Sequence, residues 1–394
     1  MQKILFVVPI LPGIGGIETA LLNLIRNIDT EKFSIDLCVY GNYIAIPEKI
    51  PEYVKVIPGT KEMEYCYVPY KTVVDKLHGI EKAQLYIIKG FKSKFGIQTV
   101  VKLVKHKYHF EQYDVAISFA NDAVLEGQFV GGGNEIVADC VNARVKIGWI
   151  HNEPYRCGCT KEYYEKIYSK FDYIVNVSEA CKKMFDEIVP SLVQKSRYVY
   201  NTFAISDIKR KAELEKPSLS TDKFQIVTVS RIENNQKRID RVVEVCKVLL
   251  EKGYNLFHWT VIGDGPDYEM IKNQIADKGM QKYITLLGYR ANPYPYIKNA
   301  DILVQTSEFE SFGMVLKEAF ICGTAVITTN FEAAKEVVDD GKNGFIVEKS
   351  AEAIAYKIIE LIKKPDILQK LNEYISNHPY TNDTAMKQFY ELLN

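Results

Sequence analysis

Two glutamates, Glu310 and Glu318, lie in the stretch of the chain whose residue types are best suited to chemistry. An apolar run (301–305) ends there, a short loop carries Glu310, and a helix is expected to begin near Gly313. A helix that begins at the carboxyl edge of a parallel sheet presents backbone N–H groups and the positive end of its dipole, which suits a diphosphate. Glu310 could accept hydrogen bonds from sugar hydroxyls, and Glu318 could hold a ribose diol. Two solvated helix residues are the alternative, and for an isolated pair of glutamates that alternative is the commoner one.

A diphosphate that departs from a sugar gathers negative charge, and positive groups must stabilise it. Many transferases use a metal held by two aspartates one residue apart, but this sequence has no convincing Asp-x-Asp at a strand end. Arg231 directly follows an apolar run, and Lys237 lies six residues later. Arginine offers a planar fork to phosphate oxygens and lysine a point charge. We therefore expect a metal-independent site, helped by the backbone amides near Gly313–Val315 and Gly15–Gly16.

Taken jointly, these residues resemble the family 4 retaining glycosyltransferases (group 1), which have the GT-B fold, an α/β fold of two Rossmann-like doubly wound domains facing a central cleft. Glu310 and Glu318 are separated by seven residues, as in the family's paired-glutamate motif. The further matches, in the family's order, are Gly15-Gly16-Ile17-Glu18, Ser230-Arg231 with Lys237, the turn Val261-Ile262-Gly263-Asp264-Gly265, and Gly288-Tyr289. The resemblance is dense over 224–347, sparse over 1–25 and 145–201, and absent over 42–110.

The resemblance implies a role for each matching residue. The catalytic residues would be His151, Glu310, Arg231 and Lys237. The residues that bind the donor would be Gly15, Gly16, Arg231, Lys237, Gly263, Tyr289, Glu310, Phe312, Gly313, Met314, Val315 and Glu318. Lys237 is one residue further from Arg231 than in the family pattern, so Lys237 or its neighbour Arg238 could be the contact. No cofactor is implied, because the nucleoside-diphosphate sugar is a substrate.

His151 ends the apolar run 145–150. A lone histidine at a strand end is usually structural, but the family keeps a histidine here at the cleft floor, near the donor's sugar. The resemblance implies hydrogen bonding to the sugar or the acceptor, not nucleophilic attack. Family members retain the anomeric configuration, and same-face attack in which the leaving phosphate helps to deprotonate the acceptor is the implied mechanism. Asn201 matches a family asparagine at the domain junction, and capping or turn formation explains it almost as well.

On family frequency, the expected donor is a UDP-hexose, with GDP-mannose second. The expected acceptor is a glycan or lipid-linked glycan in the synthesis of a bacterial surface polysaccharide or glycolipid. Residues 330–334 stand where the family commonly has a glycine-rich turn near the sugar, so the donor sugar stays open. Two other classes also stay open: a nucleotide-sugar epimerase of the same fold, and a non-catalytic relative that binds sugar nucleotides or glycans.

The elements that must position these residues follow from composition and periodicity. The chain has 394 residues, of which 47% are hydrophobic and 25% charged, as in an ordinary globular protein long enough for two domains. Continuous apolar runs alternate with amphipathic segments such as 238–251, which predicts doubly wound parallel sheets. Strands are expected at 3–9, 34–40, 113–119, 145–150, 172–177, 197–200, 224–229, 258–263, 282–287, 301–305, 325–329 and 344–347.

The pattern starts afresh near residue 222, which divides the chain. We expect an acceptor-binding domain over 1–203, a linker over 204–222 and a donor-binding domain over 223–378. The linker prediction rests on 209–223, which is charged and lacks apolar periodicity. A final helix within 379–394 could pack back on the first domain.

Net charge is zero, so no global field attracts nucleic acid. The eight cysteines are expected to be free thiols in a reducing compartment, because Cys157-Gly158-Cys159 is too closely spaced for the usual metal-binding pair. The apolar run after Lys3 is expected to be a buried strand and not a signal peptide, and no run is long enough to span a membrane. These features predict a cytoplasmic protein.

Residues 82–110 hold seven lysines and neither Asp nor Glu, with aromatic and aliphatic residues between them. A solvated helix face and a peripheral membrane surface explain this pattern equally well. In the second interpretation each lysine near anionic lipid would contribute roughly 1 kcal/mol, which suits an enzyme on the inner face of a membrane. No nucleic-acid recognition motif accompanies the charge, so nucleic acid is not an expected partner.

Overall fold

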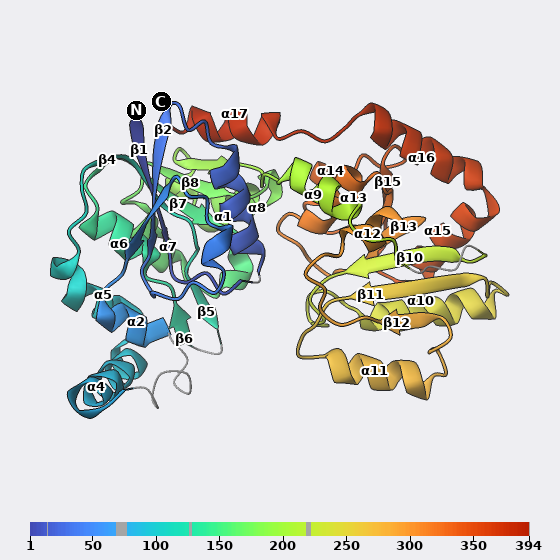
Figure 1. Cartoon of the computed structure of the whole chain (residues 1–394), viewed down its shortest axis with the longest axis horizontal. Helices are drawn as coiled ribbons and strands as arrows, with labels where there is room; N and C mark the ends of the chain where they lie inside the picture. Colours follow the sequence, from blue (N-terminus) through green and yellow to red (C-terminus); the bar gives the residue numbers. More distant parts are fainter. Residues whose placement is uncertain (14, 68–76, 126–127, 218–221, 394) are drawn as a thin grey trace. The chain divides into compact units, whose positions relative to one another are not determined.

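The computed structural model describes residues 1–13, 15–67, 77–125, 128–217 and 222–393. The chain divides into two compact units, Met1–Phe203 with Asp383–Asn394, and Ala204–Asn382. Each unit is built around a parallel sheet, coloured in chain order in Figure 1.

The sheet of the first unit has seven parallel strands in the order β3-β2-β1-β4-β7-β8-β9. Its core strands are continuous apolar runs: Ile4, Leu5, Phe6 and Val7 of β1 are all fully buried. Both faces of such a strand are covered by helices, which is why the run does not alternate with polar residues. The strands are β1 (Gln2–Val8), β2 (Phe33–Val39), β3 (Val54–Pro58), β4 (Tyr113–Ser118), β7 (Ala143–Ile150), β8 (Tyr173–Asn176) and β9 (Ser196–Tyr198), and a separate antiparallel pair is formed by β5 (Ala123–Leu125) and β6 (Gln128–Val130).

Helices and short connections complete the first unit. The helices are α1 (Gly16–Asn27), α2 (Lys61–Tyr67), α4 (Gly79–Phe95), α5 (Ile97–Val104), α6 (Gly133–Cys140), α7 (Lys161–Tyr168), α8 (Glu179–Ile188) and α17 (Asp383–Glu391). Although α17 is last in the chain, it packs on this unit: Phe389 is buried beside Trp149, and the Tyr390 ring stacks on Phe33 with centroids 5.7 Å apart. The Tyr390 hydroxyl also accepts a hydrogen bond from the backbone N–H of Asp29, at 2.9 Å.

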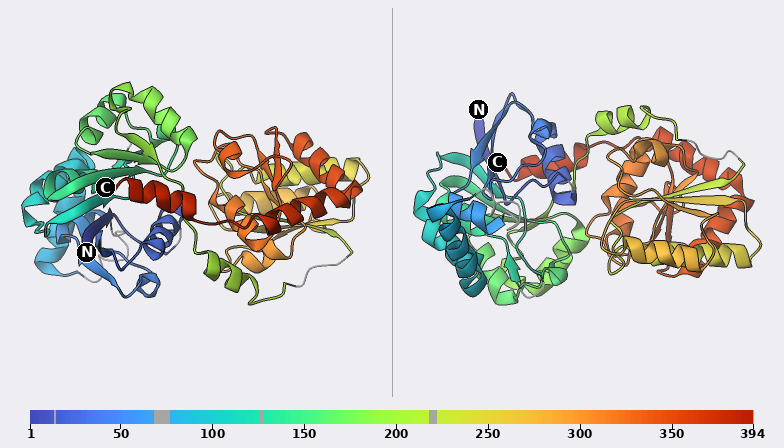
Figure 2. Two further views of the ribbon diagram at one scale, coloured as in Figure 1. Left: turned by 90° about the horizontal axis from the view of Figure 1, so that it is seen from above. Right: turned by 60° about the horizontal axis from the view of Figure 1, so that its bottom comes forward.

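The sheet of the second unit has six parallel strands in the order β12-β11-β10-β13-β14-β15, and Figure 2 shows helices on both of its faces. The strands are β10 (Phe224–Val229), β11 (Phe257–Ile262), β12 (Ile284–Leu286), β13 (Ile302–Gln305), β14 (Val326–Thr329) and β15 (Gly344–Val347). The helices are α9 (Ile205–Ala212), α10 (Asp240–Glu251), α11 (Tyr268–Asp277), α12 (Tyr294–Lys298), α13 (Met314–Cys322), α14 (Ala334–Val337), α15 (Ala351–Lys363) and α16 (Pro365–Asn377).

Each sheet has one point at which the strand order reverses. In the first unit this point lies between β1 and β4, and in the second between β10 and β13. The loops that leave two such strands diverge to opposite faces of the sheet and open a crevice at the carboxyl edge, where ligands of this fold class bind. Arg231 follows β10 and Glu310 follows β13, so both candidate residues lie at the reversal point of the second sheet.

All twelve strands expected from the sequence are present, with bounds that differ by two residues at most. The sequence pattern missed β3, β5 and β6. Strand β3 lies at the edge of the sheet, and Val54 is its buried residue. Its apolar pattern in the sequence is therefore weak. The parallel α/β architecture predicted from the alternating pattern is confirmed.

The linker expected over 204–222 begins instead with a helix. Helix α9 belongs to the second unit, where Ile208 and Ala212 are buried and the Lys211 carbonyl accepts a hydrogen bond from the Asn292 side chain at 2.9 Å. The charged residues 209–211 dominate the composition of this segment, and the apolar spacing of a narrow helix face was overlooked because of them. Residues 218–221 of the expected linker lie outside the described residues.

Within the described part of the chain, none of the helices combines the length and the apolar character that crossing a bilayer requires. All eight cysteines are unbridged.

Candidate donor site at the carboxyl edge of the second sheet

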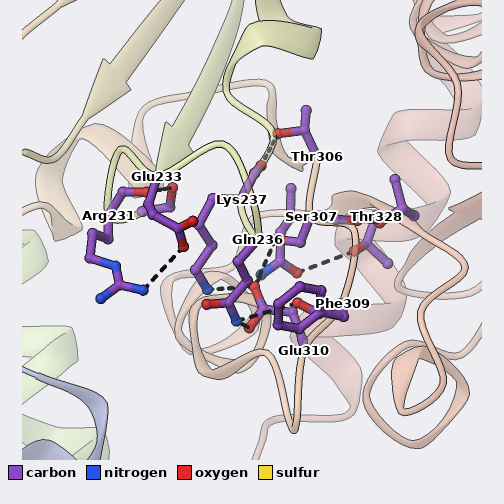
Figure 3. Close-up of polar contacts among 12 residues, drawn as sticks. Arg231, Glu233, Gln236, Lys237, Thr306, Ser307, Phe309, Glu310 and Thr328 are labelled. Carbon is purple, nitrogen blue, oxygen red and sulfur yellow. Dashed lines mark hydrogen bonds and ion pairs between the residues drawn. The ribbon is translucent and has the colours of Figure 1, made fainter. Parts of the chain in front are cut away.

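The loops that follow β10 and β13 are joined by hydrogen bonds. The backbone N–H of Glu308 donates to the Gln236 carbonyl at 2.7 Å, and the Thr306 hydroxyl donates to the Lys237 carbonyl at 2.8 Å. Because β10 and β13 pair in parallel, with Ile226 opposite Ile302, their carboxyl ends lie side by side and the two loops must meet. The polar side chains of both loops therefore converge on one place (Figure 3).

Lys237 and Glu310 form an ion pair in this place, with Lys237 Nζ 2.5 Å from Glu310 Oε1. Their side chains are only 18% and 7% exposed. The same Oε1 accepts hydrogen bonds from Gln305 Nε2 at 2.9 Å and from the Ser307 hydroxyl at 2.7 Å. Among the residues that the structure describes, Oε2 has one contact, a long one of 3.5 Å to Gln236 Nε2. One carboxylate oxygen is thus saturated by the protein, while the other keeps acceptor capacity for a ligand.

The two candidate basic residues after Arg231 have different surroundings. Lys237 contacts Glu310, whereas Arg238 binds Asp240 through Nε at 3.0 Å and has a left-handed backbone with φ of +50°. Arg231 itself is 62% exposed, and its guanidinium points away from Glu310 toward Glu233, at 3.2 Å (Figure 3). The exposed arginine and the half-buried lysine present positive charge on two sides of one loop.

Arg241, which was not among the residues predicted from the sequence, clamps the two loops together. Its side chain is buried; one guanidinium nitrogen donates to the Thr306 carbonyl at 2.9 Å, and the other lies 2.5 Å from Glu308 Oε2. Although burial acts in the opposite direction, the hydrogen bond from Arg241 holds the pKa of Glu308 below its ordinary value. Arg241 lies among the apolar positions of the expected helix 238–251. A charged residue at such a position needs a buried partner, and this signal could have identified Arg241 from the sequence.

Helix α13 begins at Met314 and is preceded by the N-cap residue Gly313, whose left-handed backbone (φ +77°) turns the chain from the loop into the helix. Among the described residues no side chain caps this helix, and its first turn carries no acidic residue. Phe312 is buried, which fixes the loop against the core, while Met314 and Val315 of the first turn are half-buried. The N-terminal amides of α13 therefore remain suited to an anion, as the sequence predicts.

Glu318 is half-buried on α13. The Tyr294 hydroxyl lies 3.4 Å from its Oε1, and burial raises the pKa of the Glu318 carboxyl to about 7. At neutral pH this group is close to half protonated, so it can both donate and accept hydrogen bonds.

Gly263 is required by backbone packing. A Cβ at this position would lie 1.8 Å from the Ser230 carbonyl oxygen, and the Gly263 backbone N–H donates to the Gly288 carbonyl at 3.0 Å. The glycine lets the loop after β11 press against the loop that carries Arg231. Tyr289, beside Gly288, is 56% exposed.

The remaining predicted residues, Gly15, Gly16 and His151, belong to the first unit. Gly15 caps α1, and among the described residues no atom beyond the chain neighbours and the adjoining helix backbone lies within 4 Å of the position that a Cβ would take on either glycine. His151 follows β7, its ring is buried against Phe119 at a centroid distance of 4.6 Å, and its backbone N–H donates to Asn121 Oδ1 at 3.1 Å.

Burial lowers the pKa of His151 to about 3, so the ring is neutral at physiological pH. Within the described part of the chain, its Nε2 has no hydrogen-bond partner. A neutral ring with one unused nitrogen can hydrogen-bond to a ligand but cannot act as a cationic acid. Asn201, also in the first unit, is buried.

The sequence of this chain is similar to those of known proteins. Residues 209–378 match the family model described as glycosyl transferases group 1. The poly(glycerol-phosphate) alpha-glucosyltransferase of Bacillus subtilis is 28% identical over 57% of this chain and 33% of its own length. The alpha-monoglucosyldiacylglycerol synthase of Acholeplasma laidlawii is 28% identical over 62% of this chain and 61% of its own length. The chain thus spans between a third and three fifths of the length of these two relatives.

Solved structures share the fold over the whole chain. HepE of Anabaena, crystallised in complex with UDP, has a TM-score of 0.67 at 18% identity, and the match covers 100% of this chain and 99% of HepE. TarM has a TM-score of 0.72 at 16% identity, with 100% and 99% covered. The fold predicted by the resemblance is confirmed: this is an α/β chain of the GT-B class, and its residues 209–378 are similar to the group 1 glycosyl transferases.

Proposed function

We propose that the protein is a retaining glycosyltransferase that moves a hexose from a UDP-sugar to a glycan or lipid-linked acceptor in the synthesis of a bacterial surface polysaccharide or glycolipid. Two observations on similar proteins support the choice. The solved structure of HepE contains UDP, and the relatives in Bacillus and Acholeplasma are named for glucosyl transfer to a glycerol-phosphate polymer and for a glucosyl lipid. GDP-mannose is the second choice of donor.

The observation that carries the proposal is the convergence of Lys237 with the uncapped N-terminus of α13 at the reversal point of the second sheet. The transition state of sugar transfer places growing negative charge on the leaving diphosphate. Preorganised positive groups that meet such charge are worth about 3–4 kcal/mol each, because they need no reorganisation during the reaction. An ammonium has three N–H donors, so Lys237 can keep its bond to Glu310 and still bind a phosphate oxygen.

Arg231 supplies the second positive group in this proposal. Its exposed guanidinium contacts Glu233 at 3.2 Å and can exchange that contact for a bidentate one with phosphate. With Arg231 and Lys237 in these roles the reaction needs no metal.

Glu310 and Glu318 hold the two ends of the donor in this proposal. Glu310 Oε2 accepts from a sugar hydroxyl, while Oε1 keeps Lys237 in place. Glu318 binds the ribose diol, and its partly protonated carboxyl suits a diol, which both donates and accepts. The exposed Tyr289 contacts the base.

In the first unit, the amides at Gly15 and Gly16 bind donor phosphate, and the unused Nε2 of His151 bonds a hydroxyl of the sugar or acceptor. Because burial lowers the pKa of His151, its ring is a weak base, and the leaving phosphate is the better base for the acceptor hydroxyl. Common UDP-hexoses are α-linked, so the α-glucosyl products in the relatives' names support retention. We place the reaction in the cytoplasm, at the inner face of the membrane.

The test is thermal unfolding of the full-length chain with UDP, GDP, ADP and their hexose conjugates, in the presence of a chelator. A uridine ligand at about a hundredfold its Kd should raise Tm by about 5 °C or more. The Lys237→Met variant should lose this shift, and the matched Lys247→Met variant, which removes a 60% exposed lysine on α10, should keep it. A shift that requires a divalent metal, or the absence of a shift with every nucleotide, would disprove the donor site as proposed.

Incubation with UDP-glucose and no acceptor separates the alternatives. A transferase leaves the donor largely intact until acceptor is added, whereas an epimerase converts it alone. Nucleotide binding without turnover on any acceptor would favour a non-catalytic relative.

A further inference from the structure

Helix α4 is the most exposed long helix of the first unit. Of its seventeen residues, Leu85 is the one that is buried, while Ile80 is 78% and Ile87 is 66% exposed. The helix lies outside α2 and α5 and not directly on the sheet (Figure 1). A helix in this position would ordinarily present polar residues to water.

One side of α4 holds it to the protein. Leu85 is buried there, Ile88 packs against the core, and Lys92 Nζ donates to the Cys66 carbonyl at 2.8 Å. Glu81, the one acidic residue of the helix, is bound to Lys61 at 2.5 Å. The acid is therefore used in attaching the helix.

The opposite side of α4 is an exposed face without acidic residues. Ile80, Ala83, Ile87, Gly90 and Lys94 follow one another at intervals of three and four residues, so they lie on one side of the helix, and all five are exposed. We call these five residues the outer face of α4. Lys82 lies beside them, and residues 82–110 add further lysines without a single acid.

The structure shows that only part of the membrane surface expected over 82–110 is exposed. Most apolar residues of α5 do not face outward: Ile97, Val100, Val101 and Val104 are buried in the core, whereas Leu103 is 56% exposed. Helix α5 therefore supports α4. Besides Tyr86, Phe95 and Leu103, the exposed apolar residues of this region are those of the outer face. Ile80, which lies before the expected segment, is the most exposed of them.

We propose that the outer face of α4 inserts into the interface of an anionic phospholipid bilayer. Charge complementarity identifies this partner, because isoleucines flanked by lysines and free of acids match a surface that is apolar below and negative above. The apolar side chains lie at the depth of the acyl boundary, and Lys82 and Lys94 reach the headgroup phosphates. The inference does not depend on the proposed donor site, because every residue in it belongs to the first unit.

The test is sedimentation of the full-length chain with vesicles of phosphatidylcholine, alone or mixed with phosphatidylglycerol, and with no nucleotide present. Binding should require the anionic lipid. The double variant Ile80→Ser with Ile87→Ser should lower the partition coefficient about tenfold. The matched control changes two leucines of the second unit that are 60% and 65% exposed, Leu214→Ser with Leu256→Ser, and should bind like the unchanged chain.

A fluorescent variant tests insertion directly. Both native tryptophans are buried, so the emission of an Ile87→Trp variant that responds to vesicles comes from the outer face. A shift to shorter wavelength with anionic vesicles supports the proposal. No binding by the unchanged chain, equal binding to both lipid mixtures, or unchanged binding by the serine variant would overturn it. A change in oligomeric mass on serine substitution, without a change in vesicle binding, would assign this face to a second copy and overturn it as well.

Discussion

Replacing Glu318 by glutamine should stabilise the protein at neutral and alkaline pH while weakening its interaction with nucleotide. Burial raises the pKa of this carboxyl to about 7, from an ordinary value of 4.5. Below pH 4.5 the group is protonated in the folded and unfolded states alike. Between pH 4.5 and 7 the unfolded state loses the proton first, so stability falls as pH rises, and above pH 7 the loss is constant.

The magnitude follows from the interval between the two pKa values. Each unit corresponds to 1.36 kcal/mol, so the wild-type carboxyl reduces the free energy of unfolding by about 3 kcal/mol above pH 7. Glutamine keeps the shape and the hydrogen-bonding capacity of the side chain but does not titrate. Glu318→Gln should therefore be more stable than wild type by about 3 kcal/mol near pH 8 and by about nothing near pH 4.5.

The two tryptophans give an assay specific to each unit, because Trp149 lies in the first unit and Trp259 in the second. Urea unfolding in a Trp149→Phe background, followed by fluorescence near pH 4.5, 6 and 8, reports the second unit alone. The exposed Glu332 provides the matched control, and Glu332→Gln should show no such pH dependence.

Two results would refute this reasoning. A stability difference between Glu318→Gln and wild type that is the same at all three pH values would show that the carboxyl is not held protonated by burial. Lower stability of the variant at pH 8 would show that the charged form is favoured in the fold. If the variant is more stable yet binds UDP as tightly as wild type, the stability argument holds, but the ribose contact proposed for Glu318 is wrong.

Three further substitutions test the loops around the site. Arg231→Ala should lower kcat about a hundredfold in a transferase assay, and it should have little effect on Tm because the side chain is 62% exposed. The control Arg210→Ala, which removes a 61% exposed and also ion-paired arginine, should leave kcat unchanged. Equal losses of kcat in the two variants would show that Arg231 has no part in the reaction. Arg241→Met should raise the Kd for UDP about tenfold. Arg241→Lys should recover part of the lost affinity, since a lysine can keep one of the two bonds, to the Thr306 carbonyl or to Glu308. Unchanged UDP affinity of Arg241→Met by calorimetry would contradict the positioning role of Arg241. Gly263→Ala should lower the free energy of unfolding by about 3 kcal/mol or more, because its Cβ would lie 1.8 Å from a backbone carbonyl oxygen. The control Gly253→Ala, at a position with a φ of +85° but open space, should lower it by only about 1 kcal/mol. Similar urea midpoints for the two variants would contradict the packing argument.

The fold was largely predictable from the sequence. Buried parallel strands must be apolar on both faces, so a strand such as β1 appears as a continuous hydrophobic run that local inspection finds. Edge elements such as β3 bury fewer residues and leave a weaker pattern. Helix α9 was missed because its buried face is narrow and its composition is dominated by charge.

The sequence also determined which residue types gather at the donor site. Arg231, Lys237 and Glu310 stand in the loops that follow β10 and β13, and parallel strands bring their carboxyl ends to one edge. What the sequence left open was the pairing across that edge. The ion pair of Lys237 with Glu310, and the clamp by Arg241, depend on contacts between residues more than sixty positions apart, which no local pattern encodes.

Exposure, too, was decided only by tertiary structure. The lysines of 82–110 are visible in the sequence, but the apolar residues between them divide into two sets with opposite surroundings. Val100 and Val101 fill the core, while Ile87 faces solvent, because α5 lies between α4 and the rest of the unit. Likewise, the pKa values of Glu318 and His151 depend on how much water reaches them in the fold. Desolvation is a property of packing in three dimensions, so side-chain type and spacing alone could not predict it.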